Sequence, residues 1–302
     1  MGKMKYKNFI PFFFLALLVL PLGCVQQGGI LPPPPTGKQV KVIATPTIST
    51  TIQIGSSEEY SLDVTNNYPK AVEDVKAYVT SPDVVVSISD KLLDFGTIDA
   101  GDTASATTTV TLGSNAIEGK EYRIAGRLCF SYSQEGWHDF IVVNESKYAT
   151  GITPSSDVED GPLTITFSGV DAPVTKTTFK PVITIANEAN GKVSSKGPTE
   201  TGDSILSKLT ITISDELIDG FSVKIDREVF NATCDATTHL CTFETTNSTL
   251  LDLEAEEQTV YLTVNVKSDK LTTEPLIDQI RFTVEYGYCI DLPTSTFTAV
   301  AA

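Results

Sequence analysis

Histidine and tryptophan are almost missing from this sequence, which has two histidines, His138 and His239, and one tryptophan, Trp137, among 302 residues. Histidine is the commonest general acid or base in enzymes, so its scarcity restricts the catalytic mechanisms available to the chain. The sequence also has no H-E-x-x-H motif, no G-x-S-x-G motif and no glycine-rich phosphate loop. We therefore expect no catalytic residues and a non-enzymatic function.

Basic residues are also few, because 22 lysines and arginines stand against 38 aspartates and glutamates, for a net charge of −16. Binding to nucleic acid requires a basic surface that displaces counterions from phosphate, so nucleic acid is not an expected partner. The same charge disfavours direct adsorption to anionic lipid. Association with a membrane would therefore require an anchor.

The apolar run at the N-terminus, residues 9–23, is shorter than the roughly 20 residues that a membrane-spanning helix needs. It follows three lysines, Lys3, Lys5 and Lys7. A short basic segment before a short apolar run is typical of a secretory signal. The chain is therefore predicted to be exported.

The run ends in Leu20-Pro21-Leu22-Gly23-Cys24. This ending resembles the lipobox of bacterial and archaeal lipoproteins, in which a small residue precedes a cysteine that is lipidated after cleavage, although Pro21 stands where the lipobox prefers leucine. The resemblance implies a signal peptide over residues 1–23, a lipid on Cys24 and a location at the outer face of the cytoplasmic membrane. An ordinary signal peptide and a retained anchor are the alternatives. Residues 24–38, rich in Gly and Pro, are predicted to form a flexible tether.

Sustained helical periodicity is absent from residue 39 onward, and short alternating runs rich in Val, Ile, Thr and Tyr occur instead. They include residues 59–65, 104–112, 122–132, 209–213, 260–266 and 280–288. This pattern is typical of β-sandwiches. The polar, acidic segment 147–162, which ends in Gly161-Pro162, indicates a linker. We therefore predict an all-β fold with two tandem immunoglobulin-like β-sandwich domains, residues 39–146 and 163–302.

The two halves also resemble each other weakly. Residues 62–65 and 72–79 match residues 209–212 and 218–225 in pattern. Near the end of each half, Cys129-Phe130-Ser131-Tyr132 and Tyr286-Gly287-Tyr288-Cys289 combine aromatic residues with a cysteine. A duplicated sandwich is the simplest explanation, and a chance likeness between two β domains is the alternative.

The segment Leu93-Asp94-Phe95-Gly96-Thr97-Ile98-Asp99-Ala100-Gly101-Asp102-Thr103 precedes a threonine-rich run. It resembles a stretch of the immunoglobulin-like modules of archaeal and bacterial cell-surface proteins, which include the CARDB type. Residues 183–187 with 191–193 are similar to the opening of such domains in archaeal surface lipoproteins. The resemblance implies immunoglobulin-like domains and a role in the cell envelope such as adhesion, but it names no ligand.

Four cysteines remain after Cys24, an even number that favours disulfides in an exported chain. Cys234 and Cys241 are near enough in sequence to close a hairpin, so we predict a disulfide between them, with a zinc site that includes His239 as the alternative. For Cys129 and Cys289 three possibilities stay open: a bond between the two domains, a bond between two molecules, or burial as small apolar residues.

Three sequons begin at Asn144, Asn231 and Asn247, which are therefore candidate glycosylation sites in an exported protein. Trp137 is a candidate binding residue, because an exposed indole could stack on a sugar or anchor an interface. The interpretation that we favour is that residues 134–136 form a hairpin turn and that Trp137 packs in the core.

Two further motifs are weaker. Asp157, Glu159 and Asp160 could bind calcium, but the EF-hand spacing is missing and a solvated acidic turn is favoured, so no metal or cofactor is predicted. Residues 202–205, Gly-Asp-Ser-Ile, are similar to the nucleophile block of GDSL esterases, but a turn before a strand is the better interpretation.

The sequence as a whole predicts a non-catalytic, lipid-anchored cell-surface protein with a structural, adhesive or binding role. Its expected partners are the membrane, reached through the lipid anchor, and other envelope proteins or glycans. The alternative is an accessory module that captures a glycan or peptide for a membrane enzyme or transporter.

Overall fold

The computed structural model describes residues 38–302 except for residues 171, 201–202 and 254–256. The described residues belong to one compact unit. Among the described residues there is no α-helix, and the helical segments are the short 3₁₀-helices η1 (Ser146–Ala149) and η3 (Ser268–Lys270). The prediction of an all-β fold is confirmed.

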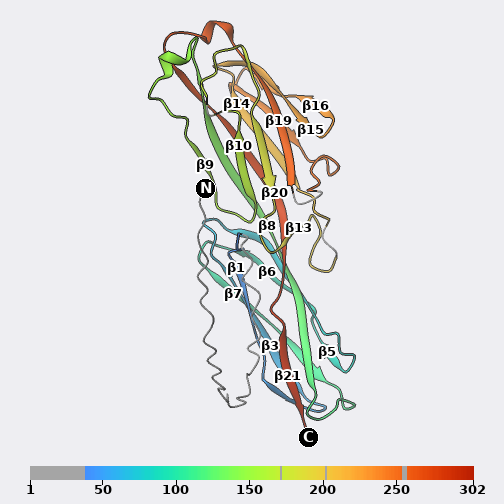
Figure 1. Cartoon of the computed structure of the whole chain (residues 1–302). Helices are drawn as coiled ribbons and strands as arrows, with labels where there is room; N and C mark the ends of the chain where they lie inside the picture. Colours follow the sequence, from blue (N-terminus) through green and yellow to red (C-terminus); the bar gives the residue numbers. More distant parts are fainter. Residues whose placement is uncertain (1–37, 171, 201–202, 254–256) are drawn as a thin grey trace, which may run out of the picture. The chain divides into compact units, whose positions relative to one another are not determined.

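The strands of the described residues form three sheets (Figure 1). The four-stranded sheet has the order β1 (Val42–Thr47), β3 (Ser57–Asn66), β7 (Thr103–Leu112), β5 (Val86–Ile88). The six-stranded sheet has the order β10 (Thr164–Ser168), β12 (Val182–Ala186), β19 (Glu257–Val266), β15 (Ile218–Ile225), β16 (Glu228–Asn231), with β11 (Thr178–Phe179) beside β19.

The eleven-stranded sheet has the main order β17 (Thr233–Asp235), β18 (Leu240–Thr245), β14 (Lys208–Ser214), β20 (Leu276–Asp291), β8 (Glu121–Val142), β21 (Ser295–Val300), β2 (Thr51–Gln53). Four further strands join it: β13 (Lys192–Val193) on β20, β4 (Val72–Thr80) and β9 (Ser156–Val158) on β8, and β6 (Leu92–Ile98) on β4. All six runs that the sequence predicted to be strands lie within observed strands, because their alternating apolar residues point into the core.

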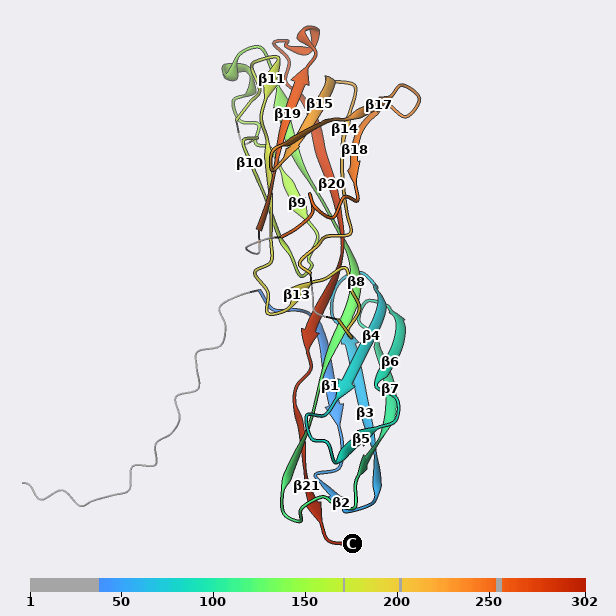
Figure 2. The ribbon, with the colours of Figure 1, turned by 90° about the vertical axis from the view of Figure 1, so that its right-hand side faces the viewer.

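Two long strands, β8 and β20, organise the unit. They pair in antiparallel register from Arg127 opposite Asp291 to Val142 opposite Leu276, and Figures 1 and 2 both show them side by side. Toward its N-terminal end, β8 pairs with β4 through residues 125–131 and, beyond the pairing with β20, with β21 through residues 121–124. One strand therefore belongs both to the sheet region built by residues before 121 and to the region built by residues after 156.

This pairing differs from the expected tandem arrangement with a linker at residues 147–162. The expected linker contains β9, which pairs with residues 136–138 of β8. The last strand, β21, was expected in the second domain, but it pairs with β8 and with β2 of the first half. Strand pairing follows backbone hydrogen bonding rather than sequence distance, so a strand as long as β8 can serve both halves. The two tandem immunoglobulin-like domains are not confirmed.

The expected internal repeat has no counterpart in the sheets. Its first copy lies on β3 and β4, which belong to the four-stranded and the eleven-stranded sheet respectively. Its second copy lies on β14 and β15, of which β14 belongs to the eleven-stranded sheet and β15 to the six-stranded one. Matching segments thus occupy opposite layers, so the similarity in sequence reflects strand patterning.

Glycines with positive φ shape the 93–103 segment. Gly96 has φ 67° and lies opposite Val75 where the pairing of β4 and β6 is irregular. Gly101 has φ 82°, and its N–H donates to the carbonyl oxygen of Asn66 at 2.7 Å. Only glycine adopts these angles without strain, which explains both positions locally.

A single large hydrophobic core extends through both halves and includes residues from Val42 to Ala299. A row of aromatic rings lies where the halves meet. The ring centroids of Tyr68 and Tyr132 are 5.0 Å apart, those of Tyr132 and Tyr286 6.2 Å, and those of Tyr286 and Tyr288 6.5 Å. Such pairs add about 0.5–1.5 kcal/mol each beyond the burial of their area, so the junction is a packed interior.

Candidate functional site

The two faces of β8 and β20 differ in chemistry. Along β8 even-numbered side chains such as Tyr132, Gln134 and Phe140 are buried, whereas the odd-numbered Ser133 and Trp137 are only partly buried. Successive residues of a strand point to opposite faces, so the odd-numbered side chains share the outer face of the sheet. The inner face holds the halves together, and the outer face is available for binding.

On the inner face, the buried amide of Gln134 fixes the segment that follows β9. Its Nε2 donates to the carbonyl oxygens of Glu159 at 2.9 Å and Leu163 at 3.1 Å, and its Oε1 accepts from the hydroxyl of Tyr286 at 2.8 Å. The hydroxyl of Tyr132 donates to the carbonyl oxygen of Asp160 at 2.8 Å. Burial raises the pKa of Tyr286 well above its usual value, so its hydroxyl stays a donor.

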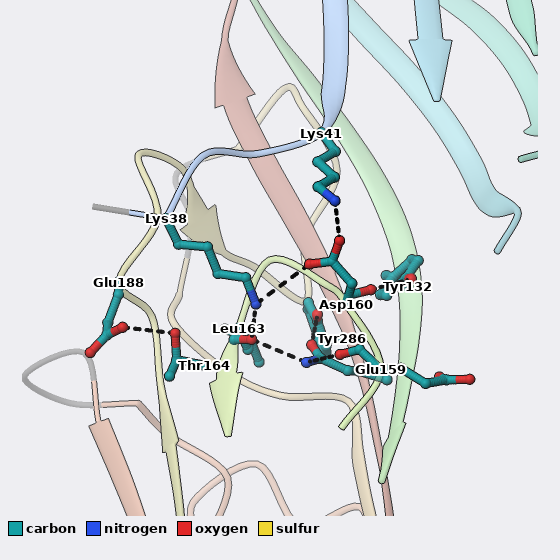
Figure 3. Close-up of polar contacts among 10 residues, drawn as sticks. Lys38, Lys41, Tyr132, Glu159, Asp160, Leu163, Thr164, Glu188 and Tyr286 are labelled. Carbon is teal, nitrogen blue, oxygen red and sulfur yellow. Dashed lines mark hydrogen bonds and ion pairs between the residues drawn. The ribbon is translucent and has the colours of Figure 1, made fainter. Parts of the chain in front are cut away.

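Lysines from the start of the described chain reach the same segment, as Figure 3 shows. Lys38 donates to the carbonyl oxygen of Leu163 at 2.9 Å and lies 3.9 Å from Asp160, and Lys41 pairs with Asp160. Burial lowers the pKa of Lys38, although Asp160 opposes this effect. The acidic segment is thus paired with lysines. Asp160 is therefore not a free solvated acid. Among the described residues there is no group of three or more His, Cys, Asp or Glu placed to hold a metal.

The pairing of Cys129 is now defined, since it forms a disulfide with Cys289. The two residues lie directly opposite each other on β8 and β20, and both are nearly buried. Residues 192–195 cover this part of the outer face, where the N–H of Ser194 donates to the carbonyl oxygen of Gly287 at 2.9 Å. A side chain at position 287 would collide with Ser194, so glycine is needed there.

The predicted disulfide between Cys234 and Cys241 is confirmed. It joins β17 to β18 in a hairpin whose turn contains His239 with φ 54°. Because both sulfurs are in the disulfide, the alternative zinc site is wrong. Two disulfides are typical of proteins that fold outside the reducing cytoplasm, and the chain is extracytoplasmic.

A groove of about 600 Å³ opens on the outer face at the junction. Its lining residues come from β8, from β20 and from the segments before β4 and β14: Lys70, Ala71, Glu73, Ser131, Tyr132, Ser133, Ser207, Glu285 and Tyr286. Lys70 pairs with Glu135 at 3.2 Å and with Glu159 at 2.7 Å. The groove therefore combines charged side chains and the serines Ser131, Ser133 and Ser207 with a similar amount of apolar surface.

Trp137 lies on this same outer face, farther along β8. The expected hairpin turn at residues 134–136 is wrong, because β8 runs unbroken through it, and the expected core packing of Trp137 is wrong for the same reason. An unbroken strand keeps residue 137 in phase with residues 133 and 135 and so turns the indole outward. Directly opposite it stand Asp157 of β9 and Arg281 of β20.

A hydrogen-bonded network orders the polar side chains beside Trp137. Nε and Nη2 of Arg281 donate to Oε1 of Gln279 at 3.2 and 2.9 Å. Nε2 of Gln279 in turn donates to Oδ1 of Asp139 at 3.1 Å, and Ser155 donates to the other oxygen of Asp139. The guanidinium group of the residue opposite Trp137 is thus held in place, which reduces the entropy lost when a ligand binds.

The sequons are accessible in the structure. Asn144, Asn231 and Asn247 are all exposed. In the third sequon, Oδ1 of Asn247 accepts hydrogen bonds from the N–H of Thr249 at 3.1 Å and from its hydroxyl at 2.8 Å. Exposure permits glycosylation but does not demonstrate it, so all three stay predictions.

Two further residues from the sequence analysis, Ser204 and Cys24, can be located relative to the described structure. Ser204, with φ 60°, lies in the segment before β14, and Oδ1 and Oδ2 of its neighbour Asp203 accept hydrogen bonds from Ser195. Cys24, the predicted lipidation site, lies outside the described residues. None of the helical segments in the described part of the chain has the length and apolar character needed to span a membrane.

Comparison with known proteins gives no family. No protein-family description matches the chain, and no curated protein matches it. Among solved structures, the secreted serine protease VesC from Vibrio cholerae shares 12% identity over 85% of this chain and 51% of VesC, with a TM-score of 0.23. This chain therefore spans about half the length of VesC.

Two further structures are similarly distant. Red sea bream transglutaminase shares 8% identity over 87% of this chain and 32% of its own, with a TM-score of 0.21. The YadV chaperone shares 6% identity over 76% and 86%, with a TM-score of 0.20. Likeness at this level supports no statement about activity, and the resemblance to CARDB-type surface modules stays a prediction.

Sequence reasoning singled out Trp137 but missed Gln134 and Arg281. A signal for Gln134 was present, because it occupies an even position between Tyr132 and Phe140 in an alternating run, where a buried polar residue needs partners. No signal existed for Arg281, because its position beside Trp137 depends on the register of two strands that are distant in sequence.

Proposed function

We propose that this chain is a non-catalytic, lipid-anchored cell-surface protein that presents a stiff β body with a binding face to the outside of the cell. The N-terminal signal, the lipobox-like ending at Cys24 and the Gly- and Pro-rich segment 24–38 support the anchor and tether. The disulfides support an extracytoplasmic location. Adhesion or envelope structure is the role that fits these features best.

The observation that carries the proposal is the continuous pairing of β8 with β20 across both halves, closed by the Cys129–Cys289 disulfide. Two halves joined by a flexible linker would rotate independently. Here the shared strands and the common core oppose such rotation. A rigid body suits a protein that must hold a surface at a defined distance from a membrane.

The start of the described chain supports the same role. Lys38, the last residue of the predicted tether, bonds to Leu163, while Lys41 pairs with Asp160. Force applied through the tether would therefore reach both halves at their junction. The immunoglobulin-like character of the halves, which the antiparallel sheets favour, belongs to this proposal too.

Metabolic labelling with a lipid precursor tests the anchor. We expect the wild-type protein to carry label and to fractionate with membranes, and Cys24→Ser to lose label and to be released. Cys129→Ser is the control, because it removes a cysteine of the folded body and should leave the label in place. An unlabelled wild-type protein whose localisation does not change in Cys24→Ser would contradict the proposal.

The second candidate function is an accessory module that captures a ligand for a membrane enzyme or transporter. The groove and the outward Trp137, on one face of the same two strands, favour it. Both functions require the anchor, and they differ in whether the outer face binds a small ligand saturably.

A further inference from the structure

The outer face carries a straight row of side chains across five strands. Directly opposite residues in antiparallel strands point to the same face. The register places Asp157 of β9, Trp137 of β8, Arg281 of β20, Thr212 of β14 and Thr242 of β18 in one line. With neighbouring strands about 4.8 Å apart, the row spans about 19 Å. It is long enough for a ligand of several linked units.

The row places hydrogen-bond donors and acceptors on both sides of the aromatic ring of Trp137. The carboxylate of Asp157 accepts, the guanidinium of Arg281 donates, and the hydroxyls of Thr212 and Thr242 do both. None of these side chains is buried. Vicinal sugar hydroxyls also donate and accept, and the apolar face of a sugar ring packs on an indole, so this combination matches a saccharide.

This face carries no excess of positive charge. Asp157 and Arg281 stand on the two sides of Trp137 with opposite charge. In the adjoining groove acids outnumber lysines, because Lys70 pairs with both Glu135 and Glu159, and Lys208 lies near both Glu244 and Glu285. An anionic ligand would meet like charge at this groove, so a neutral chain fits the face better than an anionic one.

An extended peptide fits this face poorly. Peptides commonly bind sheets by adding a strand to a free edge. At Trp137, β8 is paired on one side with β9 and on the other with β20, and β20 is paired beyond with β14. No free edge exists in the middle of this row, so recognition there must use side chains.

We propose that the row from Asp157 to Thr242, with Trp137 as its stacking platform, binds a neutral oligosaccharide chain. The inference deepens the second candidate function and rests on it. Trp137 stacks on a sugar ring, Arg281 and Asp157 hold hydroxyls on the two sides of that ring, and the threonines contact the following sugars. Gln279 and Asp139 position the guanidinium of Arg281 and need not touch the ligand.

The test uses the full chain in detergent and two sets of probes: neutral hexasaccharides of glucose, mannose and galactose, and hexasaccharides of the corresponding uronic acids. Because Trp137 is the only tryptophan, its fluorescence reports binding in the wild-type protein directly. We expect at least one neutral hexasaccharide to bind saturably and to change the emission. Trp137→Ala should weaken that binding at least about tenfold, as for an aromatic hot-spot residue.

Tyr261→Ala is the matched control, because Tyr261 is an exposed aromatic residue of β19 in the six-stranded sheet. It should leave affinity within about twofold of the wild type, the range expected for a residue outside the site. The inference is overturned if no neutral hexasaccharide binds saturably, if only uronic acid chains bind, or if bound sugar leaves the emission unchanged.

Lipid labelling of Cys24 is an independent readout of the proposed function. Labelled protein that binds no neutral sugar would refute the oligosaccharide site and leave the anchored role standing. Unlabelled protein that binds sugar through Trp137 would support the site and refute the anchor. The two failures are therefore distinguishable.

Discussion

The two faces of the β8–β20 pair share a backbone but differ in how their polar groups are satisfied. On the inner face, Gln134 has no exposed surface and uses both ends of its amide within the protein. On the outer face, Arg281 is exposed, and the only protein acceptor that it contacts in the described residues is Gln279. The inner polar groups stabilise the fold, whereas the outer ones can still form hydrogen bonds with a ligand.

The difference teaches where substitutions should be costly. A polar group that loses its partner inside the protein costs the full desolvation penalty, whereas one on the surface regains water. Changes on the inner face should therefore reduce stability and leave sugar binding unaffected. Changes at Trp137 or Arg281 should weaken sugar binding and leave the stability nearly unchanged. The predictions below test this contrast from the largest expected effect to the smallest.

The largest effect is expected from removing the disulfide between the two central strands. Replacing both Cys129 and Cys289 by Ser should lower the free energy of unfolding by about 5 kcal/mol, because the bond closes a loop that spans 160 residues. The matched double variant of Cys234 and Cys241 should lose only about 2–3 kcal/mol, because that loop spans 7 residues. Guanidinium chloride unfolding measures both, and equal losses would contradict the loop-length argument.

Next comes the inner-face amide. Gln134→Leu keeps a similar volume but leaves the Tyr286 hydroxyl and two carbonyl oxygens without their partner. We expect a loss of about 3 kcal/mol in the free energy of unfolding. The control, Ser133→Ala, changes the neighbouring outward residue and should stay within about 0.5 kcal/mol. A Gln134→Leu variant as stable as Ser133→Ala would show that the network contributes nothing.

A third test uses pH at Asp278, an inner-face acid near the beginning of β20. Its pKa is raised to about 6, chiefly by burial; the N–H of Gln279 and the charge of Arg281 oppose this rise, and Glu216 and Asp139 add to it. The folded state therefore holds this proton more tightly than the unfolded state, so the stability that Asp278 contributes is complete below about pH 4 and is lost as pH rises to about 6.

Asp278→Asn should remove this dependence. At pH 7.5 the variant should exceed the wild type by up to about 2 kcal/mol in free energy of unfolding, less than the full pKa shift implies because the carboxyl group is partly exposed to water, and at pH 4 the two should be alike. Denaturant midpoints measured from pH 4 to pH 8 give the answer. A difference that stays constant over this range would rule out titration of Asp278 as its cause.

The smallest effect is expected at the surface ion pair of Lys41 and Asp160. Lys41→Gln should change the free energy of unfolding by less than about 1 kcal/mol, and the change should shrink further in 1 M salt, because both side chains are partly exposed. Thermal unfolding at low and high salt measures it. A larger, salt-independent loss would mean that Lys41 belongs with the inner-face network.

The two four-residue segments that contain Cys129 and Cys289 show how much could be predicted from the sequence. It recognised Cys129-Phe130-Ser131-Tyr132 and Tyr286-Gly287-Tyr288-Cys289 as a matching pair and interpreted them as equivalent strands of two domains. In the structure they face each other residue by residue, from Cys129 opposite Cys289 to Tyr132 opposite Tyr286. The sequence pattern identified the two segments. Only the antiparallel register showed that they pair with each other and are not equivalent strands of two separate domains.

The sequence by itself determined the all-β class, the positions of the strand-forming runs and the hairpin disulfide, because each depends on residues within a few positions of one another. Only the tertiary structure decided that β8 serves both halves, that Cys129 pairs with Cys289, and that Trp137 faces outward beside Arg281. These features depend on which distant strands pair and in what register. A shift of one residue in a strand exchanges its two faces, so the local sequence cannot fix them.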